Sequence, residues 1–138
     1  DYWEQALNAN CNFVHLGQED MLDADINFLK KKNVKIGVST HDEEELDNAL
    51  SISPDYVALG PIWETKLKKM KWAPQGLLRL KLWKKKIGNI PLVAIGGLNI
   101  ERAKLALKAG ADIVSVVSDI TLSKNPKKTI IRWIKEIR

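Results

Sequence analysis

Cysteine is almost absent from this chain of 138 residues, in which Cys11 is the only one. No internal disulfide can form, and a single thiol favours a reducing, cytoplasmic environment. Long apolar runs are absent too, since none approaches the roughly 20 residues that a membrane-spanning helix needs. We therefore expect neither a disulfide-stabilised secreted domain nor a membrane-embedded protein.

Arginine is also scarce. The chain carries a net charge of +5, but only Arg79, Arg102, Arg132 and Arg138 stand among its 22 basic residues. Proteins that read nucleic acid more often use arginine, whose planar guanidinium matches phosphate and guanine. We therefore expect no nucleic-acid partner and interpret most lysines as solvated surface. The positive balance remains compatible with an anionic small molecule as substrate.

The composition is that of an ordinary folded protein. Apolar residues make up 45% of the chain and charged residues 28%, which suffices for a hydrophobic core. No linker or low-complexity tract divides the chain, so we expect residues 1–138 to form one domain or one piece of a domain. Because the chain begins at Asp1 rather than Met, we also expect a segment upstream of it.

Strands and helices alternate along the predicted structure. Short runs of β-branched and apolar residues predict strands at 13–16, 35–39, 56–59, 92–95 and 113–117, and helical patterns follow at 21–32, 43–50, 76–87, 100–109 and from 126 onward. Residues 2–10 are interpreted as the end of a preceding helix. The strand runs are mostly continuous, as expected for strands covered on both faces. Repeated strand–helix units predict a parallel sheet.

Capping residues support these helix boundaries. Thr40 followed by Glu43 is typical of a capping box at the start of the second helix. Asn99 is placed to cap the helix at 100–109, and Gly110 stands where a C-terminal glycine is expected. Asn125 followed by Pro126 predicts the start of the last helix.

Two parallel architectures compete. A doubly wound sheet of the flavodoxin type has five strands and suits this length. An eight-stranded barrel needs about 250 residues, or about 200 at the short end, so this chain would supply only five of its strands. Length alone favours the doubly wound sheet, but the motifs favour the barrel.

The residues with chemical potential follow the carboxyl ends of the predicted strands, where both architectures place their active sites. A glycine pair, Gly96-Gly97, lets backbone N–H groups approach a phosphate, but it is also common in tight turns. Ser118, after the next strand, strengthens the phosphate interpretation because glycines and a hydroxyl after the last two strands match the phosphate site of such barrels.

Other strand-end residues are more ambiguous. Asp20 is suited to Mg²⁺, which prefers carboxylate and phosphate oxygens, but an aspartate near a helix start is more often a cap. Lys68 either contacts an anion or is one more solvated lysine. His15 and His41 have the chemistry of a base, but the sequence shows no partner for either, and we interpret both as structural polar residues.

Six motifs occur together, in order, over essentially the whole chain. They are His15-Leu16-Gly17-Gln18-Glu19-Asp20, Gly37-Val38-Ser39-Thr40-His41, Gly60-Pro61-Ile62-Trp63-Glu64-Thr65 with Lys68, Ala73-Pro74-Gln75-Gly76, Ala94-Ile95-Gly96-Gly97 and Val116-Val117-Ser118. This ordered set resembles the thiamine-phosphate synthase family. The resemblance implies an α/β fold, a (β/α)₈ TIM barrel, of which only strands four to eight are present in this chain.

The resemblance also implies an activity. The family condenses hydroxymethylpyrimidine diphosphate with thiazole phosphate, giving thiamine phosphate and pyrophosphate, with Mg²⁺ as cofactor. Carried over by position, Asp20 is the metal ligand, Ser39 contacts the pyrimidine substrate, Lys68 contacts pyrophosphate, and Thr65, Gly97, Val117 and Ser118 hold the thiazole phosphate. Ser39 and Lys68 are thereby the candidate catalytic residues. The partners implied are small phosphorylated molecules, and an assembly of identical chains is left open.

The chain departs from the family pattern in two respects. Leu67 stands where the family commonly has threonine, which puts one hydroxyl contact in doubt. The family's Gln-x-Arg-x-Lys motif and its Asn-Asp pair have no counterpart and would lie upstream of Asp1. We therefore expect residues 1–138 alone to be inactive.

Two other functions compete with the synthase. One is a thiazole tautomerase-like barrel, against which Asp20 and Lys68 argue, because a tautomerase has no diphosphate to hold. The other is an inactive remnant that binds phosphorylated ligands.

Overall fold

The computed structural model describes residues 2–65 and 71–137. Its elements are α1 (Trp3–Asn8), β1 (Phe13–Leu16), α2 (Gln18–Asp23), α3 (Ile26–Lys31), β2 (Lys35–Thr40), α4 (Glu43–Ser51), β3 (Tyr56–Leu59), α5 (Gly76–Ile87), β4 (Leu92–Ile95), α6 (Ile100–Lys108), β5 (Ile113–Ser115), α7 (Ser118–Thr121) and α8 (Pro126–Ile137). The five strands form one sheet in the order β1-β2-β3-β4-β5, and every neighbouring pair is parallel. The predicted parallel α/β fold is confirmed.

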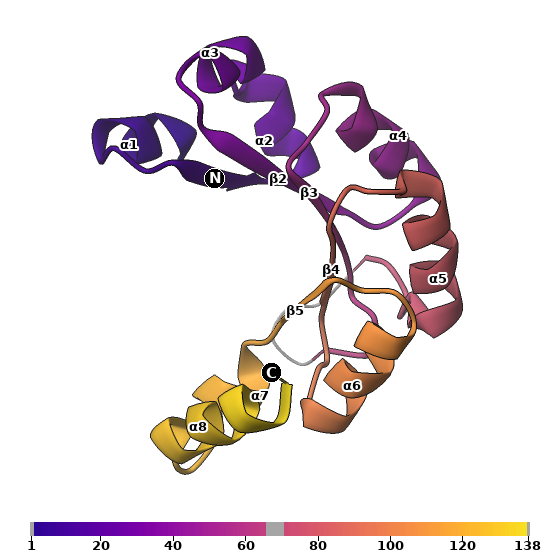
Figure 1. The fold of residues 1–138 in the computed structure, drawn as a ribbon. Coiled ribbons are helices and arrows are strands. Elements are labelled where there is room, and N and C mark those ends of the chain that lie inside the picture. The colour runs from indigo at the N-terminus through magenta and orange to yellow at the C-terminus, as the bar shows by residue number, and fades with distance from the viewer. Residues whose placement is uncertain (1, 66–70, 138) are drawn as a thin grey trace.

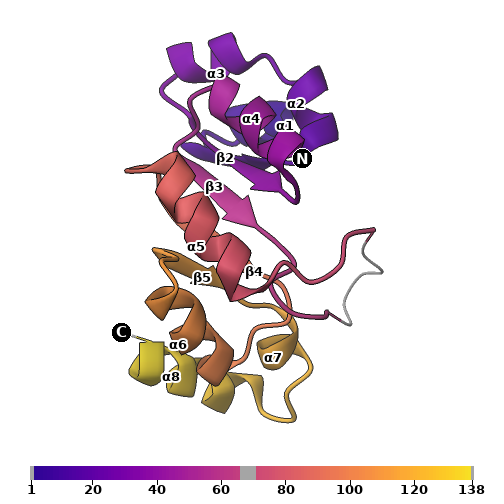
Figure 2. The same ribbon diagram turned by 90° about the vertical axis from the view of Figure 1, so that its right-hand side faces the viewer.

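The sheet is curved. Figure 1 shows the strands along an arc, with α2 to α6 and α8 on its outer side and an open concave side. Figure 2 shows α5 and α6 across the outer face and the strand ends pointing to one edge, where α7 also lies. A doubly wound sheet would have a different strand order and helices on both faces. The choice of a barrel-like wall over that architecture is therefore confirmed.

The helix predicted at 21–32 is wrong as a single element. The chain instead forms α2 and α3, separated by an extended Ala24. The reason is local: the Asp25 carboxylate accepts the Phe28 N–H at 2.9 Å and so starts a new helix. An N-cap aspartate satisfies donors that a continuous helix would have bonded to its own backbone.

The capping box predicted at Thr40 is also wrong. Thr40 is fully buried as the last residue of β2 and donates its hydroxyl to the Ala58 carbonyl oxygen at 2.8 Å. The cap of α4 is Asp42, which accepts the Glu45 N–H at 2.9 Å. The predicted cap Asn99 is confirmed, since it accepts the Arg102 N–H at 2.9 Å. The strand predicted at 113–117 ends earlier, at Ser115, and α7 begins at Ser118.

The hydrophobic core lies between the sheet and its outer helices. One cluster joins β1 and β2 to α3 and α4, a second joins β3 and β4 to α4, α5 and α6, and a third surrounds Trp133 of α8. Side chains alternate along each strand, so the opposite set faces the concave side. On that side Phe13 and Ile113 remain 41% and 48% exposed. Within the described residues, no helix is long and apolar enough to cross a membrane.

Two aspartates fix the amino ends of the strands. Asp55, just before β3, accepts the Ile36 N–H of β2 at 2.8 Å. Asp112, just before β5, accepts the Leu92 N–H of β4 at 2.7 Å and an Nζ–H of Lys84 at 2.8 Å. Burial acts to raise the pKa of Asp112, but the bonds from Lys84 and Leu92 hold it below its usual value. The same device thus ties β3 to β2 and β5 to β4.

Replacing Asp112 should destabilise the fold. In the full-length protein, Asp112→Ala leaves the Leu92 N–H without its acceptor and should lower the free energy of unfolding by about 1–2 kcal/mol at pH 7. Because the folded pKa lies below the unfolded value, this contribution is present at neutral pH and lost as the pH falls below about 4. The difference in unfolding free energy between wild type and Asp112→Ala should therefore be smaller below about pH 4 than at pH 7. Urea titrations at pH 7 and below about pH 4 measure this difference.

The matched control is Asp47→Ala, which removes an exposed ion pair with Lys86 (2.6 Å). Exposed pairs contribute little, so this change should stay within about 0.5 kcal/mol. Equal losses from both variants would show that Asp112 acts only as a surface charge.

Candidate active site at the carboxyl ends of the strands

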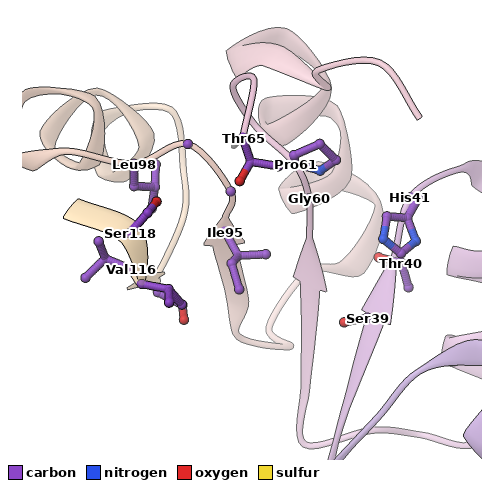
Figure 3. A pocket seen from close by; sticks show the side chains of 14 residues that line it. Ser39, Thr40, His41, Gly60, Pro61, Thr65, Ile95, Leu98, Val116 and Ser118 are labelled. Atoms are coloured by element: carbon purple, nitrogen blue, oxygen red, sulfur yellow. The ribbon is translucent and has the colours of Figure 1, made fainter. Parts of the chain in front are cut away.

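A pocket opens at the carboxyl ends of β2 to β5. Figure 3 shows its lining in chain order, from Ser39 and His41 across Thr65 and Ile95 to Val116 and Ser118. The complete lining comprises Ser39, Thr40, His41, Gly60, Pro61, Thr65, Ile95, Gly96, Gly97, Leu98, Ser115, Val116, Val117 and Ser118. Five residues predicted for substrate binding, Ser39, Thr65, Gly97, Val117 and Ser118, are therefore brought together in one pocket. The parallel pairing explains this, because it places every strand's carboxyl end at the same edge.

The glycine pair packs directly against the segment after β3. A Cβ atom at Gly97 would lie 2.5 Å from the Glu64 carbonyl oxygen and 2.8 Å from that of Trp63. A Cβ at Gly96 would lie 2.6 Å from the Pro61 Cα. Both glycines have positive φ, 93° and 66°. Sterics and backbone conformation thus both require glycine here.

Backbone hydrogen bonds hold the same contact. The Ile62 N–H donates to the Ile95 carbonyl oxygen at 2.9 Å, and the Trp63 N–H donates to that of Gly96 at 3.2 Å. Arg102 donates to the Gly97 carbonyl oxygen at 2.6 Å, and its guanidinium lies 5.5 Å from the centre of the Trp63 ring. These contacts fix Thr65 relative to the glycine pair.

Ser39 is held from two sides. The Gln18 amide donates to the Ser39 backbone oxygen at 2.8 Å, and the His15 Nε2 lies 2.7 Å from the Ser39 Oγ. On the other side of the imidazole, Nδ1 lies 2.6 Å from the Tyr56 hydroxyl oxygen. Partial burial lowers the pKa of His15 and raises that of Tyr56, so both groups are neutral near pH 7.

Asp20 lies at the start of α2, outside the lining of the pocket. Its Oδ2 accepts the Gly17 N–H at 2.8 Å, and this hydrogen bond is the main reason why the pKa of Asp20 lies below its usual value. Both interpretations of Asp20 thus have support: it caps the helix, and it is an ionised oxygen donor of the kind that Mg²⁺ prefers. Among residues 2–65 and 71–137, no three His, Cys, Asp or Glu side chains gather around one point. A Mg²⁺ ion at Asp20 would therefore need further oxygen ligands, such as those of a phosphorylated substrate.

Lys68 lies outside the described residues. Trp72 is anchored, because its ring stacks on His41 with centroids 3.9 Å apart and its Nε1–H donates to Asp42 at 3.3 Å. His41 in turn contacts the Glu45 carboxylate through Nδ1 at 2.7 Å. His15 and His41 both have partners that the sequence alone did not reveal, which are Ser39 and Tyr56 for His15 and Glu45 and Trp72 for His41.

The sequence reasoning missed Tyr56 and the role of His15. A signal was present for both. Gly37 stands inside a predicted strand, and a glycine there often marks the close approach of another group. The group is Tyr56, whose position opposite Gly37 depends on the strand register.

The fold and the pocket define the class of protein: a parallel α/β protein with a pocket at the carboxyl ends of a curved sheet. Comparison with known proteins gives the family. The family model described as thiamine monophosphate synthase matches residues 1–120. The thiamine-phosphate synthase of Rhizobium etli is 52% identical over 134 residues, 97% of this chain and 66% of the relative. That of Cronobacter sakazakii is 46% identical over 121 residues, 88% of this chain and 58% of the relative.

A solved structure agrees. Thiamine phosphate pyrophosphorylase from Pyrococcus furiosus superposes with a TM-score of 0.80 at 29% identity, over 97% of this chain and 63% of that one. The chain belongs to the thiamine monophosphate synthase family. It spans less than two thirds of the length of these relatives.

Replacing Gly97 should disturb the pocket more than replacing a comparable glycine. Gly97→Ala forces a positive φ, which costs an alanine about 1–2 kcal/mol, and also pushes the Glu64 and Trp63 carbonyl groups away. Gly76→Ala is the control, since Gly76 has φ of 70° and no atom within 4 Å of the added Cβ. Urea unfolding of the full-length variants should show a larger loss for Gly97→Ala. Equal losses of unfolding free energy in the two variants would mean that a Cβ atom at position 97 does not clash with the segment after β3.

Proposed function

We propose that the protein containing these residues is a thiamine-phosphate synthase, a transferase that joins hydroxymethylpyrimidine diphosphate to thiazole phosphate and releases pyrophosphate. The main support is the convergence of Thr65, Gly97, Val117 and Ser118 around one pocket, with Ser39 across it. Hydroxyl groups and glycine backbone at the carboxyl ends of the last strands suit a phosphate. The relatives are named thiamine-phosphate synthases, which supports thiazole phosphate as the proposed ligand.

Each residue has a proposed role. Thr65 and Ser118 donate their hydroxyls to the thiazole phosphate, while Gly97 and Val117 let the backbone approach it. Ser39 contacts the pyrimidine diphosphate, and Lys68 neutralises the charge that builds on the departing pyrophosphate. Asp20 holds Mg²⁺ together with substrate oxygens. When bound, the metal neutralises diphosphate charge.

The proposed chemistry is dissociative. The carbon–oxygen bond to diphosphate breaks first, the electron-rich pyrimidine carries the resulting methylene cation, and the thiazole nitrogen forms the new bond. The protein contributes mainly by holding the two substrates in line and by stabilising the leaving diphosphate. A rigid pocket, fixed by the contact between the glycine pair and residues 61–64, suits this task.

The five strands are proposed to be strands four to eight of a (β/α)₈ barrel. The curvature, the sequential order and the one-sided helices support this assignment. The chain covers 63% of the Pyrococcus furiosus structure, close to five eighths of a barrel wall. Residues 1–138 are then the C-terminal portion of a single domain, the partners are small phosphorylated molecules, and the enzyme works in the cytoplasm.

The function is tested with the full-length protein. Both substrates are supplied with Mg²⁺, and thiamine phosphate and released pyrophosphate are measured together. Equal amounts of the two products are expected. A tautomerase-like protein, or one that only binds phosphorylated ligands, would release no pyrophosphate, and that result would overturn the proposal.

Asp20→Asn should separate the two roles of Asp20. The asparagine oxygen can still accept the Gly17 N–H, so stability should change little, but the charge that suits Mg²⁺ is lost. We expect kcat to fall by about 10²–10³-fold, as for other lost electrostatic contacts, and the Mg²⁺ requirement to rise. Steady-state kinetics over a Mg²⁺ series measure both. Asp23→Asn, on the same helix, is the control, and unchanged Mg²⁺ dependence in Asp20→Asn would remove Asp20 from the site.

Lys68→Ala should lower kcat more than it raises KM for thiazole phosphate. A cation that acts on the leaving pyrophosphate is worth more in the transition state than in the ground state. The expected loss in kcat is again about 10²–10³-fold. Lys66→Ala and Lys69→Ala are the controls and should do little. Equal losses in all three would instead indicate a diffuse basic surface.

A further inference from the structure

Three polar side chains form a line on the concave face of the sheet. The Tyr56 hydroxyl oxygen of β3 lies 2.6 Å from the His15 Nδ1 of β1, and the His15 Nε2 lies 2.7 Å from the Ser39 Oγ of β2. The Tyr56 and His15 rings are also stacked, with centroids 5.6 Å apart and planes 15° apart. The line ends at Ser39, which lines the pocket.

The register of the strands builds this line. His15 pairs with Gly37, and Gly37 pairs with Tyr56, so His15, Gly37 and Tyr56 stand in one row across β1, β2 and β3. A Cβ atom at Gly37 would lie 2.0 Å from the Tyr56 ring. Only glycine therefore lets the tyrosine cross β2 and reach the histidine, and Phe13 stacks on the tyrosine at 5.5 Å.

The chemistry of the three groups determines which group donates each hydrogen bond along the line. A neutral imidazole has one N–H donor and one acceptor nitrogen, so it cannot donate to both hydroxyls. A phenol, with a pKa near 10, is a far more acidic donor than an aliphatic hydroxyl. The Tyr56 hydroxyl therefore donates to Nδ1. The His15 proton then resides on Nε2 and is donated to the Ser39 Oγ.

We propose that Tyr56 and His15 are positioning residues that make the Ser39 hydroxyl a hydrogen-bond donor to the diphosphate of the substrate. The imidazole N–H occupies a lone pair of the Ser39 oxygen, so the serine proton points to an acceptor in the pocket. Diphosphate oxygens only accept hydrogen bonds, which matches this polarity. The inference rests on the proposed function for the identity of the ligand, but the direction of the line does not depend on it.

The direction is tested without any assay of activity. Long-range ¹H–¹⁵N NMR of the full-length protein at neutral pH shows which ring nitrogen carries the proton, and the signals of His15 are assigned by their loss in His15→Gln. We expect the Nε2–H tautomer for His15. His41 is the internal control, because its Nδ1 faces the Glu45 carboxylate at 2.7 Å and should carry the proton. An Nδ1–H tautomer at His15 would overturn the proposal.

Kinetics test the effect on Ser39. Tyr56→Phe keeps the ring over Gly37 but removes the donor to Nδ1, so we expect kcat to fall by about tenfold, the worth of one hydrogen bond, with little change in KM for thiazole phosphate. His15→Gln can still present an N–H to Ser39 and should retain more activity than His15→Ala. Phe13→Leu, which alters the stacking but not the polar line, should stay within about twofold of wild type.

The outcomes separate the two proposals. If wild type makes no thiamine phosphate, the proposed function fails while the NMR result still decides the direction of the line. If wild type is active and Tyr56→Phe retains full kcat, or if His15→Gln and His15→Ala are equally impaired, the positioning role of Tyr56 and His15 is wrong.

Discussion

The parallel pairing of consecutive strands is the constraint on which the rest of this structure depends. Each strand must be followed by a crossover that returns the chain to the same end, and right-handed crossovers place the helices on one face. The outer face of the sheet consequently packs against the core, and the concave face carries the opposite set of strand side chains, among them Phe13, His15, Tyr56 and Ile113. The same pairing gathers every strand's carboxyl end at one edge, so residues far apart in sequence meet there.

The pocket at that edge is shaped by backbone rather than by large side chains. Gly96 and Gly97 have no Cβ atoms, so residues 61–64 can pack directly against them. Two backbone hydrogen bonds join the two segments. A contact of this kind leaves little freedom for movement, because any displacement breaks hydrogen bonds or creates overlap. Rigidity suits a site whose proposed task is to hold two substrates in line.

The concave face carries a chain of hydrogen-bonded side chains that ends at the pocket. Tyr56, His15 and Ser39 are hydrogen-bonded to one another across three strands, and the Phe13 and His15 rings stack on Tyr56. A chain of hydrogen bonds has a single favoured polarity once one donor dominates. The fold thereby gives a direction to a serine hydroxyl that would rotate freely on an isolated strand.

The sequence by itself determined the order of strands and helices, the parallel sheet, the family and five of the residues that line the pocket. These features depend on short-range patterns, such as the strand runs, the Asn99 cap and the Gly96-Gly97 pair. It did not determine the break at Asp25, the burial of Thr40, or the partners of His15 and His41. Those outcomes depend on contacts over 18 to 41 residues of separation, such as Thr40 with Ala58 and His15 with Ser39 and Tyr56, or on local competition, as at the Asp25 cap and in the pair of His41 with Glu45. Only the tertiary structure decided them, because strand register places a side chain opposite its partner and a shift of one residue would turn that side chain to the other face.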